Sequence, residues 1–247
     1  MSTNVINKIS FGKGKQARAA FQQMLNDMRE PGEDSVYFNL NKIIPMPENL
    51  NIEAGTRTDR GLELYREFVR DRENPSVDFI ERWKKIAERE PVEWDLGKRA
   101  YCNIQDYGVP TWHEWYLPNW GTRQNAYDTQ LNEEENTIEF QTAGAPVPNI
   151  LEALSQKYPE QTIHYRWASE DFGFDVGECK FKYGLRVWDN VPTPGSRQAF
   201  EMSAEICGID LEDFDLYLTP DGSTYEYMDD DFEPEEKKQP KSRDQER

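Results

Sequence analysis

The sequence is poor in histidine, in cysteine and in positive charge. Its 247 residues include two histidines and three cysteines, and 29 Lys and Arg face 47 Asp and Glu, which gives a formal net charge of −18. Nucleic-acid backbones and anionic lipid surfaces are bound through clustered Lys and Arg. We therefore expect neither direct nucleic-acid binding nor membrane binding.

The sequence also contains no signal that indicates a disulfide, a secretory leader or a membrane span. The three cysteines, Cys102, Cys179 and Cys207, are odd in number, and none lies in a C-x-x-C pair. No apolar run approaches the roughly 18–20 residues that cross a bilayer, and no secretory hydrophobic stretch follows Met1. These absences predict a soluble, cytoplasmic protein with free thiols.

What is present favours one folded, elaborated domain. Hydrophobic residues make up 36% of the chain and aromatic residues 13%, enough for a core beneath a very polar surface. We expect a single domain over residues 1–225 with a helical, aromatic-rich insertion at about 50–130. Residues 226–247 hold nine acidic and five basic side chains, and this composition predicts a disordered, charged tail.

Hydrophobic periodicity predicts two strand-helix-strand units. Alternation indicates strands and a three-to-four-residue spacing indicates helices. The predicted strands are 4–10, 35–44, 137–142 and 162–167, followed by a hairpin over 174–188, and the predicted helices are 16–28, two within 55–90, 146–158 and 197–207. Two such units can share one antiparallel sheet, as in split β-α-β folds.

Three stretches carry a resemblance to a known family. They are residues 41–47 (NKIIPMP), 115–126 (WYLPNWGTRQNA) and 140–148 (FQTAGAPVP). In this order they resemble the YubB-type ferredoxin-like proteins of plasmids and phages, over roughly residues 1–190. The resemblance implies an α+β, ferredoxin-like split β-α-β fold and a mobile-element context, and it implies no reaction.

No motif predicts catalysis, a cofactor or a metal site. His113 and His164 lack a second ligand at helical spacing, so we interpret them as ordinary polar residues. The glycine-rich stretch 12–15 (GKGK) lacks the long spacer of a phosphate-binding loop, so a strand-to-helix turn is favoured. The acidic stretch beginning at Asp210 lacks the glycine that a calcium loop needs at its sixth position, where Asp215 stands.

The aromatic-rich section around 101–127 offers one candidate ligand site. Aromatic rings can stack on bases, sugars or partner side chains. The residues that would line such a small-molecule or nucleotide pocket, in an enzyme or a binding domain, are Trp112, His113, Trp115, Trp120 and Arg123. The interpretation we favour is that the tryptophans pack between the insertion and the sheet, that 120–122 form a turn, and that Arg123 pairs with a carboxylate.

The other candidate is the negative surface itself. Carboxylates can occupy a cationic groove that otherwise holds nucleic acid, which gives fast, salt-sensitive association. The residues predicted to contact a partner are Glu170, Asp171, Asp175, Asp210, Glu212, Asp213 and Asp215. The sequence hypothesis is therefore a non-enzymatic acidic binding protein of a mobile element that inhibits a host or defence protein by covering a basic surface.

Overall fold

A six-stranded antiparallel sheet forms the centre of the molecule. The computed structural model describes residues 3–29 and 37–228. The strands lie in the order β2-β3-β1-β4-β5-β6, and each neighbouring pair is antiparallel. Their bounds are β1 Asn4–Ser10, β2 Tyr127–Asn132, β3 Thr137–Ala143, β4 Ile163–Ser169, β5 Val176–Lys182 and β6 Leu185–Asn190.

The connections confirm the expected ferredoxin-like topology. Helix α1 (Lys15–Met28) follows β1, and helix α7 (Pro148–Lys157) links β3 to β4. The order β2-β3-β1-β4 interleaves the two split β-α-β units in one sheet. The predicted hairpin, β5 and β6, extends the sheet beyond β4.

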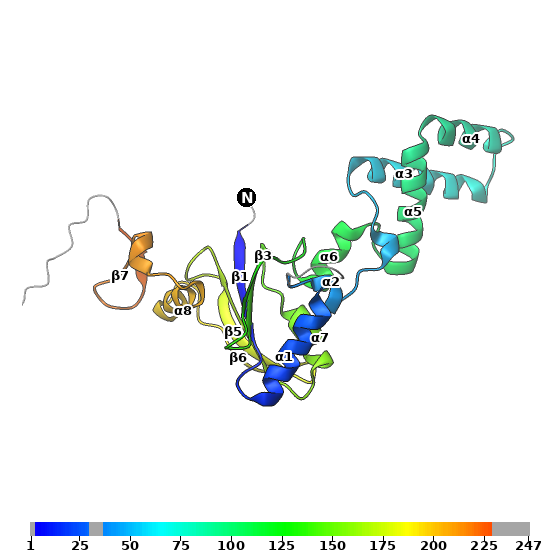
Figure 1. The fold of residues 1–247 in the computed structure, drawn as a ribbon. Coiled ribbons are helices and arrows are strands. Elements are labelled where there is room, and N and C mark those ends of the chain that lie inside the picture. Colours follow the sequence, from blue (N-terminus) through cyan, green and yellow to red (C-terminus); the bar gives the residue numbers. More distant parts are fainter. Residues whose placement is uncertain (1–2, 30–36, 229–247) are drawn as a thin grey trace, which may run out of the picture.

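The two faces of the sheet are covered to different extents. Helices α1 and α7 lie on one face, and α8 (Arg197–Cys207) lies on the other (Figure 1). Period-2 alternation sends Val5, Asn7 and Ile9 of β1 into the α1/α7 layer, where they are buried. Helix α8 covers only one end of its face, where its apolar side chains pack on Ala168 and Val176. The other end of that face stays open.

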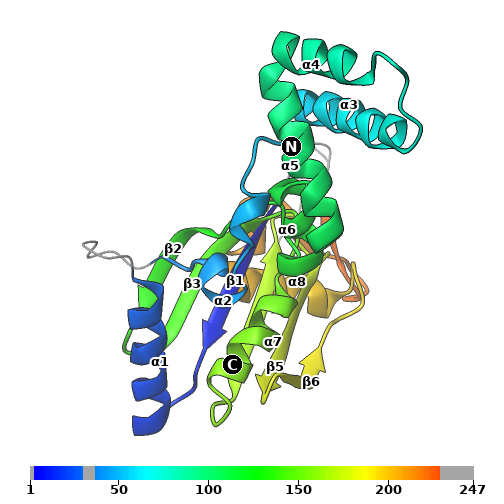
Figure 2. The same ribbon diagram turned by 90° about the vertical axis from the view of Figure 1, so that its right-hand side faces the viewer.

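The expected helical insertion is confirmed and forms an arm. Its elements are α3 (Thr56–Glu73), α4 (Phe79–Arg89) and α5 (Pro91–Tyr107), and they project from the sheet (Figures 1 and 2). Helix α6 (Trp112–Trp120) returns the chain to the main core. The arm has its own ring cluster, in which Phe68 contacts Phe79, Trp83 and Trp94.

The predicted strand over 35–44 is wrong. Its first two residues lie outside the described residues, and Leu40–Ile43 form a short helix, α2, followed by the 3₁₀ turn η1 (Glu48–Leu50). The side chain of Asn39 caps α2 by accepting a hydrogen bond from the Asn41 amide at 3.0 Å. Leu40 and Ile43, three residues apart, are both buried. The second strand of the first unit is instead β2, at the far end of the insertion.

A small C-terminal unit follows α8. It consists of the 3₁₀ turn η2 (Leu211–Phe214) and a two-stranded sheet of β7 (Leu216–Leu218) and β8 (Tyr225–Tyr227), which the sequence analysis does not predict. Strand β8 contains the first two residues of the expected tail. Met228 follows β8, and residues 229–247 of the expected tail lie outside the described residues.

Two further sequence expectations concern membranes and thiols. Within the described part of the chain, no helix combines the length and the apolar composition that crossing a bilayer requires. The three cysteines are free thiols, with Cys102 exposed and Cys179 buried. Burial raises the pKa of the Cys179 thiol to about 12, so this group stays protonated at neutral pH.

A buried polar network joins three strands beneath α7. The Tyr165 hydroxyl donates to Asn7 Oδ1 at 2.6 Å and accepts from the Val147 amide at 2.9 Å. Asn7 Nδ2 donates to Thr142 Oγ1 at 2.9 Å. Burial raises the pKa of Tyr165 well above its usual value, so the phenol remains a donor at neutral pH.

Replacing Tyr165 with Phe is expected to lower the free energy of unfolding by about 1–3 kcal/mol, since it leaves Asn7 Oδ1 and the Val147 amide without their partner. Urea unfolding measures the change. Tyr227→Phe is the matched control, because Tyr227 is exposed, and it should change stability by less than about 0.5 kcal/mol. Equal stability of the two variants would contradict the role of the network.

Candidate functional site

The negative charge of the chain is concentrated in two segments, 170–175 and 197–228, which we call the acidic lobe. Together they contain eleven carboxylates and one basic residue, Arg197. Their net charge of −10 is more than half of the −18 of the whole chain. The charge is therefore segregated and not spread evenly.

An apolar contact holds the two segments of the lobe together. The ring of Phe172, in the β4–β5 loop, meets the ring of Phe214, in η2, edge to face with centroids 5.0 Å apart. Beneath them lie the buried side chains of Phe200, Leu211 and Leu216. Because Asp171 is adjacent in sequence to one ring and Asp213 and Asp215 to the other, this contact brings together two distant chain segments that carry carboxylates.

All seven residues predicted to contact a partner are exposed on this lobe. Two of them also have local structural roles. Glu170 accepts hydrogen bonds from the backbone and side chain of Asn4, at 3.1 and 2.6 Å, and so fixes the start of β1. Asp210 caps η2 by accepting from the Glu212 amide at 3.1 Å. The other five predicted residues have neither of these roles, and they are Asp171, Asp175, Glu212, Asp213 and Asp215.

Few cations offset the charge of the lobe. Arg197 pairs with Glu201 at 2.7 Å, and Arg166 of β4 pairs with Glu205 at 3.0 Å. Among the described residues, none of the seven predicted carboxylates forms an ion pair. Four large apolar side chains of the lobe, Phe174, Phe214, Leu218 and Tyr227, are also exposed. Exposed apolar side chains on a polar surface are a feature of protein-docking surfaces.

Four of the five aromatic-section candidates lie on α6, but they differ in burial and in the residues that they contact. Trp115 and Trp120 are buried in the main core, as the packing interpretation predicts. Trp112 packs on Tyr116 with ring centroids 5.1 Å apart, and His113 is exposed beside Glu114. Arg123 is exposed at an open depression near Gly144, and in the part of the chain described it has no ion pair with a carboxylate, contrary to expectation.

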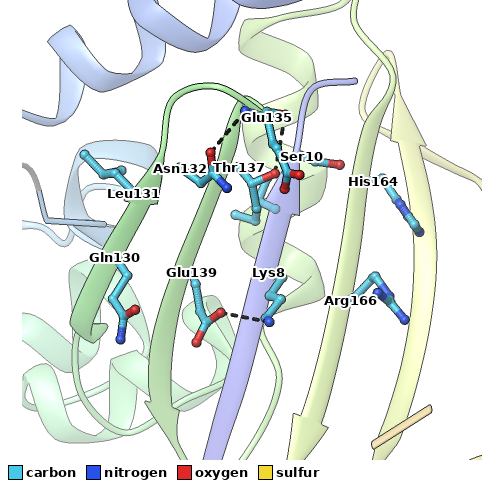
Figure 3. Close-up of a pocket in the computed structure, with 11 residues that line it drawn as sticks. Lys8, Ser10, Gln130, Leu131, Asn132, Glu135, Thr137, Glu139, His164 and Arg166 are labelled. Atoms are coloured by element: carbon cyan, nitrogen blue, oxygen red, sulfur yellow. Dashed lines mark hydrogen bonds and ion pairs between the residues drawn. The ribbon is translucent and has the colours of Figure 1, made fainter. Parts of the chain in front are cut away.

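The open end of the α8 face forms a polar depression of about 500 Å³ that the sequence analysis missed (Figure 3). Lys8 of β1 pairs with Glu139 of β3 at 3.0 Å across its floor. Glu178 of β5 accepts from His164 at 2.8 Å and lies 3.6 Å from Arg166. Burial lowers the pKa of His164 despite the hydrogen bond to Glu178, so the imidazole is neutral at pH 7. Alternation along each strand could have placed these side chains on one face, but the order of the strands could not be read locally.

Comparisons with known proteins place one recognised domain in this chain. Residues 119–210 match the family model described as the ferredoxin-like domain in Api92-like protein, a segment that contains β2 to β6 and α8. The crystal structure of protein api92 from Yersinia pseudotuberculosis aligns with a TM-score of 0.32 and 9% identity, covering 79% of this chain and 99% of that one. No curated protein matches.

Proposed function

We propose that this protein is a non-enzymatic binding protein that docks through its acidic lobe onto a cationic surface of another protein. The observation that supports this most directly is charge segregation, with a net charge of −10 on residues 170–175 and 197–228. Such a surface attracts a basic partner over distances of about one Debye length, roughly 8 Å at physiological salt, and so speeds encounter.

The lobe also has features that would add affinity at close range. The lobe exposes apolar side chains as well as carboxylates, and aromatic residues are enriched at the centres of interfaces. These side chains are Phe174, Phe214, Leu218 and Tyr227. The carboxylates have no competing ion pairs among the described residues apart from those of Glu201 and Glu205. A basic groove that normally holds a phosphate backbone would find both complementary charge and apolar contacts here.

The finer part of the proposal concerns the origin and target of the protein. The resemblance of residues 41–47, 115–126 and 140–148 to YubB-type proteins supports a mobile-element origin. A mobile element gains from blocking a host or defence protein that acts on nucleic acid. We therefore propose that the partner is such a protein, and that docking is competitive with its nucleic acid.

A charge-neutralised variant tests the proposal. Asp210→Asn, Glu212→Gln, Asp213→Asn and Asp215→Asn remove four charges, and Asn retains the capping ability of residue 210. The control variant removes four exposed arm charges instead, through Glu63→Gln, Glu67→Gln, Glu73→Gln and Asp106→Asn. Both variants have a net charge of −14, so they differ only in where the charge is lost.

A basic protein recovered from host lysate at low salt is then titrated by calorimetry with the native protein and with both variants. We expect the lobe variant to bind about tenfold or more weakly, the arm variant to bind like the native protein, and duplex DNA to compete. If both variants weakened partner binding equally, the attraction would depend on net charge alone and the proposal of a docking lobe would be contradicted. Failure to retain any basic protein at low salt would also contradict the proposal.

A further inference from the structure

A second depression lies at the opposite end of β1 from the acidic lobe. It has a volume of about 620 Å³ and is formed by the β1–α1 loop, the α7–β4 loop and the neighbouring parts of β4 and β5. The lobe reaches the start of β1 through Glu170 and Asn4, whereas this depression begins at Ser10, the last residue of the strand. Roughly 20 Å of strand separates the two.

The lining of this depression is cationic in a strongly acidic chain. Lys13, Lys15 and Lys180 line it together with His164, and none of the lining residues is a carboxylate. In the described part of the chain, none of the three lysines forms an ion pair with an acidic side chain. This convergence is unexpected where carboxylates outnumber Lys and Arg by 47 to 29.

Strand register explains how distant residues meet here. Ser10 of β1 pairs with His164 of β4, which pairs with Lys180 of β5, which pairs with Trp188 of β6. Side chains paired across neighbouring strands lie on the same face of the sheet. The result is a row that carries hydroxyl, imidazole, ammonium and indole groups, with no carboxylate, beside the β1–α1 loop.

The adjacent row on the same face contains the carboxylates, and each already has a cation. Glu139 is paired with Lys8, and Glu178 is bound by His164 and lies near Arg166. These pairs limit the repulsion between the carboxylates and an anion bound in the neighbouring depression. Figure 3 shows the pair of Lys8 and Glu139. Lys180 is positioned by Trp188, since its ammonium lies 4.8 Å from the centroid of the indole ring.

Backbone donors complete the lining. The first intrahelical hydrogen bond of α1 runs from the Arg18 amide to the Gly14 carbonyl at 3.0 Å, so the amides of Lys15, Gln16 and Ala17 have no intrahelical acceptor. No side chain caps this helix end. The loop itself is fixed by Asn136, whose side-chain amide donates to the Gly12 carbonyl at 2.9 Å.

We propose that this depression binds the phosphate group of a small phosphorylated metabolite of the mononucleotide class. Lys13, Lys15 and Lys180 would neutralise the phosphate, and the α1 amides would donate hydrogen bonds to its oxygens. Trp188 lies outside the lining itself, but it is paired with Lys180 across β5 and β6 and is 42% exposed, so its indole would stack on the base of a bound nucleotide. A small ligand is favoured over a nucleic-acid strand because the acidic lobe would repel a long polyanion.

Heteronuclear NMR titration of the full chain tests the site directly, with inorganic phosphate and AMP as separate probes. We expect saturable shifts of the Lys15, Gln16 and Ala17 amides with both probes. AMP should additionally shift the Trp188 indole signal and bind more tightly than phosphate. Shifts of the α1 amides that do not saturate, or no shifts at all, would overturn the proposal.

A matched pair of variants separates the site from net charge. Lys13→Gln with Lys15→Gln removes two cations from the depression, and Lys84→Gln with Lys98→Gln removes two exposed cations from the arm. We expect the first variant to weaken AMP binding at least about tenfold and the second to leave it within about twofold. Equal weakening by both, or tighter binding of a single-stranded oligonucleotide than of AMP, would contradict a small-ligand site. Loss of AMP binding leaves the acidic lobe intact, so failure here is distinct from failure of the docking proposal.

Discussion

Replacing Trp120 with Ala is expected to lower the free energy of unfolding by about 3–5 kcal/mol, the cost typical of removing a fully buried large aromatic side chain. Trp120 is only 1% exposed and belongs to the main core. Its ring stacks on Tyr116 at a centroid distance of 4.1 Å and meets Trp115 edge to face at 5.7 Å. Truncation would leave a cavity where α6 joins the sheet layer.

The indole N–H of Trp120 adds a specific bond to this packing. It donates to the Ile44 carbonyl at 2.9 Å, and so connects the end of α6 with the residue that follows α2. Trp120→Phe keeps a ring but leaves that carbonyl without its donor. We therefore expect this variant to fall between the native protein and Trp120→Ala.

Urea unfolding followed by circular dichroism measures these differences. Trp112→Ala is the control, because Trp112 is only half-buried and lies on the same helix. A loss of stability no larger for Trp120→Ala than for Trp112→Ala would show that Trp120 does not hold the insertion to the core.

Replacing Gly97 with Leu is expected to destabilise the arm by more than about 3 kcal/mol, the upper end of ordinary overpacking. Helices α3 and α5 touch backbone to backbone at this point. A Cβ on Gly97 would overlap the carbonyl of Gly61, and a Cβ on Gly61 would overlap the carbonyl of Glu93. Because the obstacles are backbone atoms, no side-chain rotation relieves them, and the helices must separate.

Hydrogen exchange localises this effect. Amides of α3 and α5 should lose protection in Gly97→Leu, whereas amides of β1, β3 and β4 should keep theirs, because the arm has its own core of Ile52, Leu62, Leu96 and Ala100. Lys98→Leu, at the next and exposed position, is the control. Unchanged protection in α3 would contradict the close helix crossing, and equal loss in the sheet would contradict an independent arm.

Local pattern was a reliable guide wherever burial follows one period. Strand β3 alternates strictly between buried and half-buried residues, and α1 buries Phe21, Met24, Leu25 and Met28 at helical spacing. The pattern fails over 35–44, where it predicts a strand but the structure contains a short helix with Leu40 and Ile43 buried. Asn39 in front of that pair is an N-cap signal that favours the helix.

The sequence pattern does not predict strand β2, for a different physical reason. It is an edge strand whose residues are mostly exposed, and its pairing with β3 has a register shift between Tyr127 and Gln130. An exposed, irregular edge strand has no need of apolar alternation. Only pairing with β3 makes the segment a strand, and pairing with a distant partner is not encoded in its own pattern.

The sequence by itself determined the excess of carboxylates, the positions of most helices and strands, and the ferredoxin-like class, because charge and hydrophobic period are local properties of the chain. Only the tertiary structure decided where those charges lie. The Phe172–Phe214 contact joins two acidic segments into one lobe, and strand order sets Lys13 beside His164 and Lys180. Both surfaces arise from contacts between residues far apart in the chain, which no window of sequence contains.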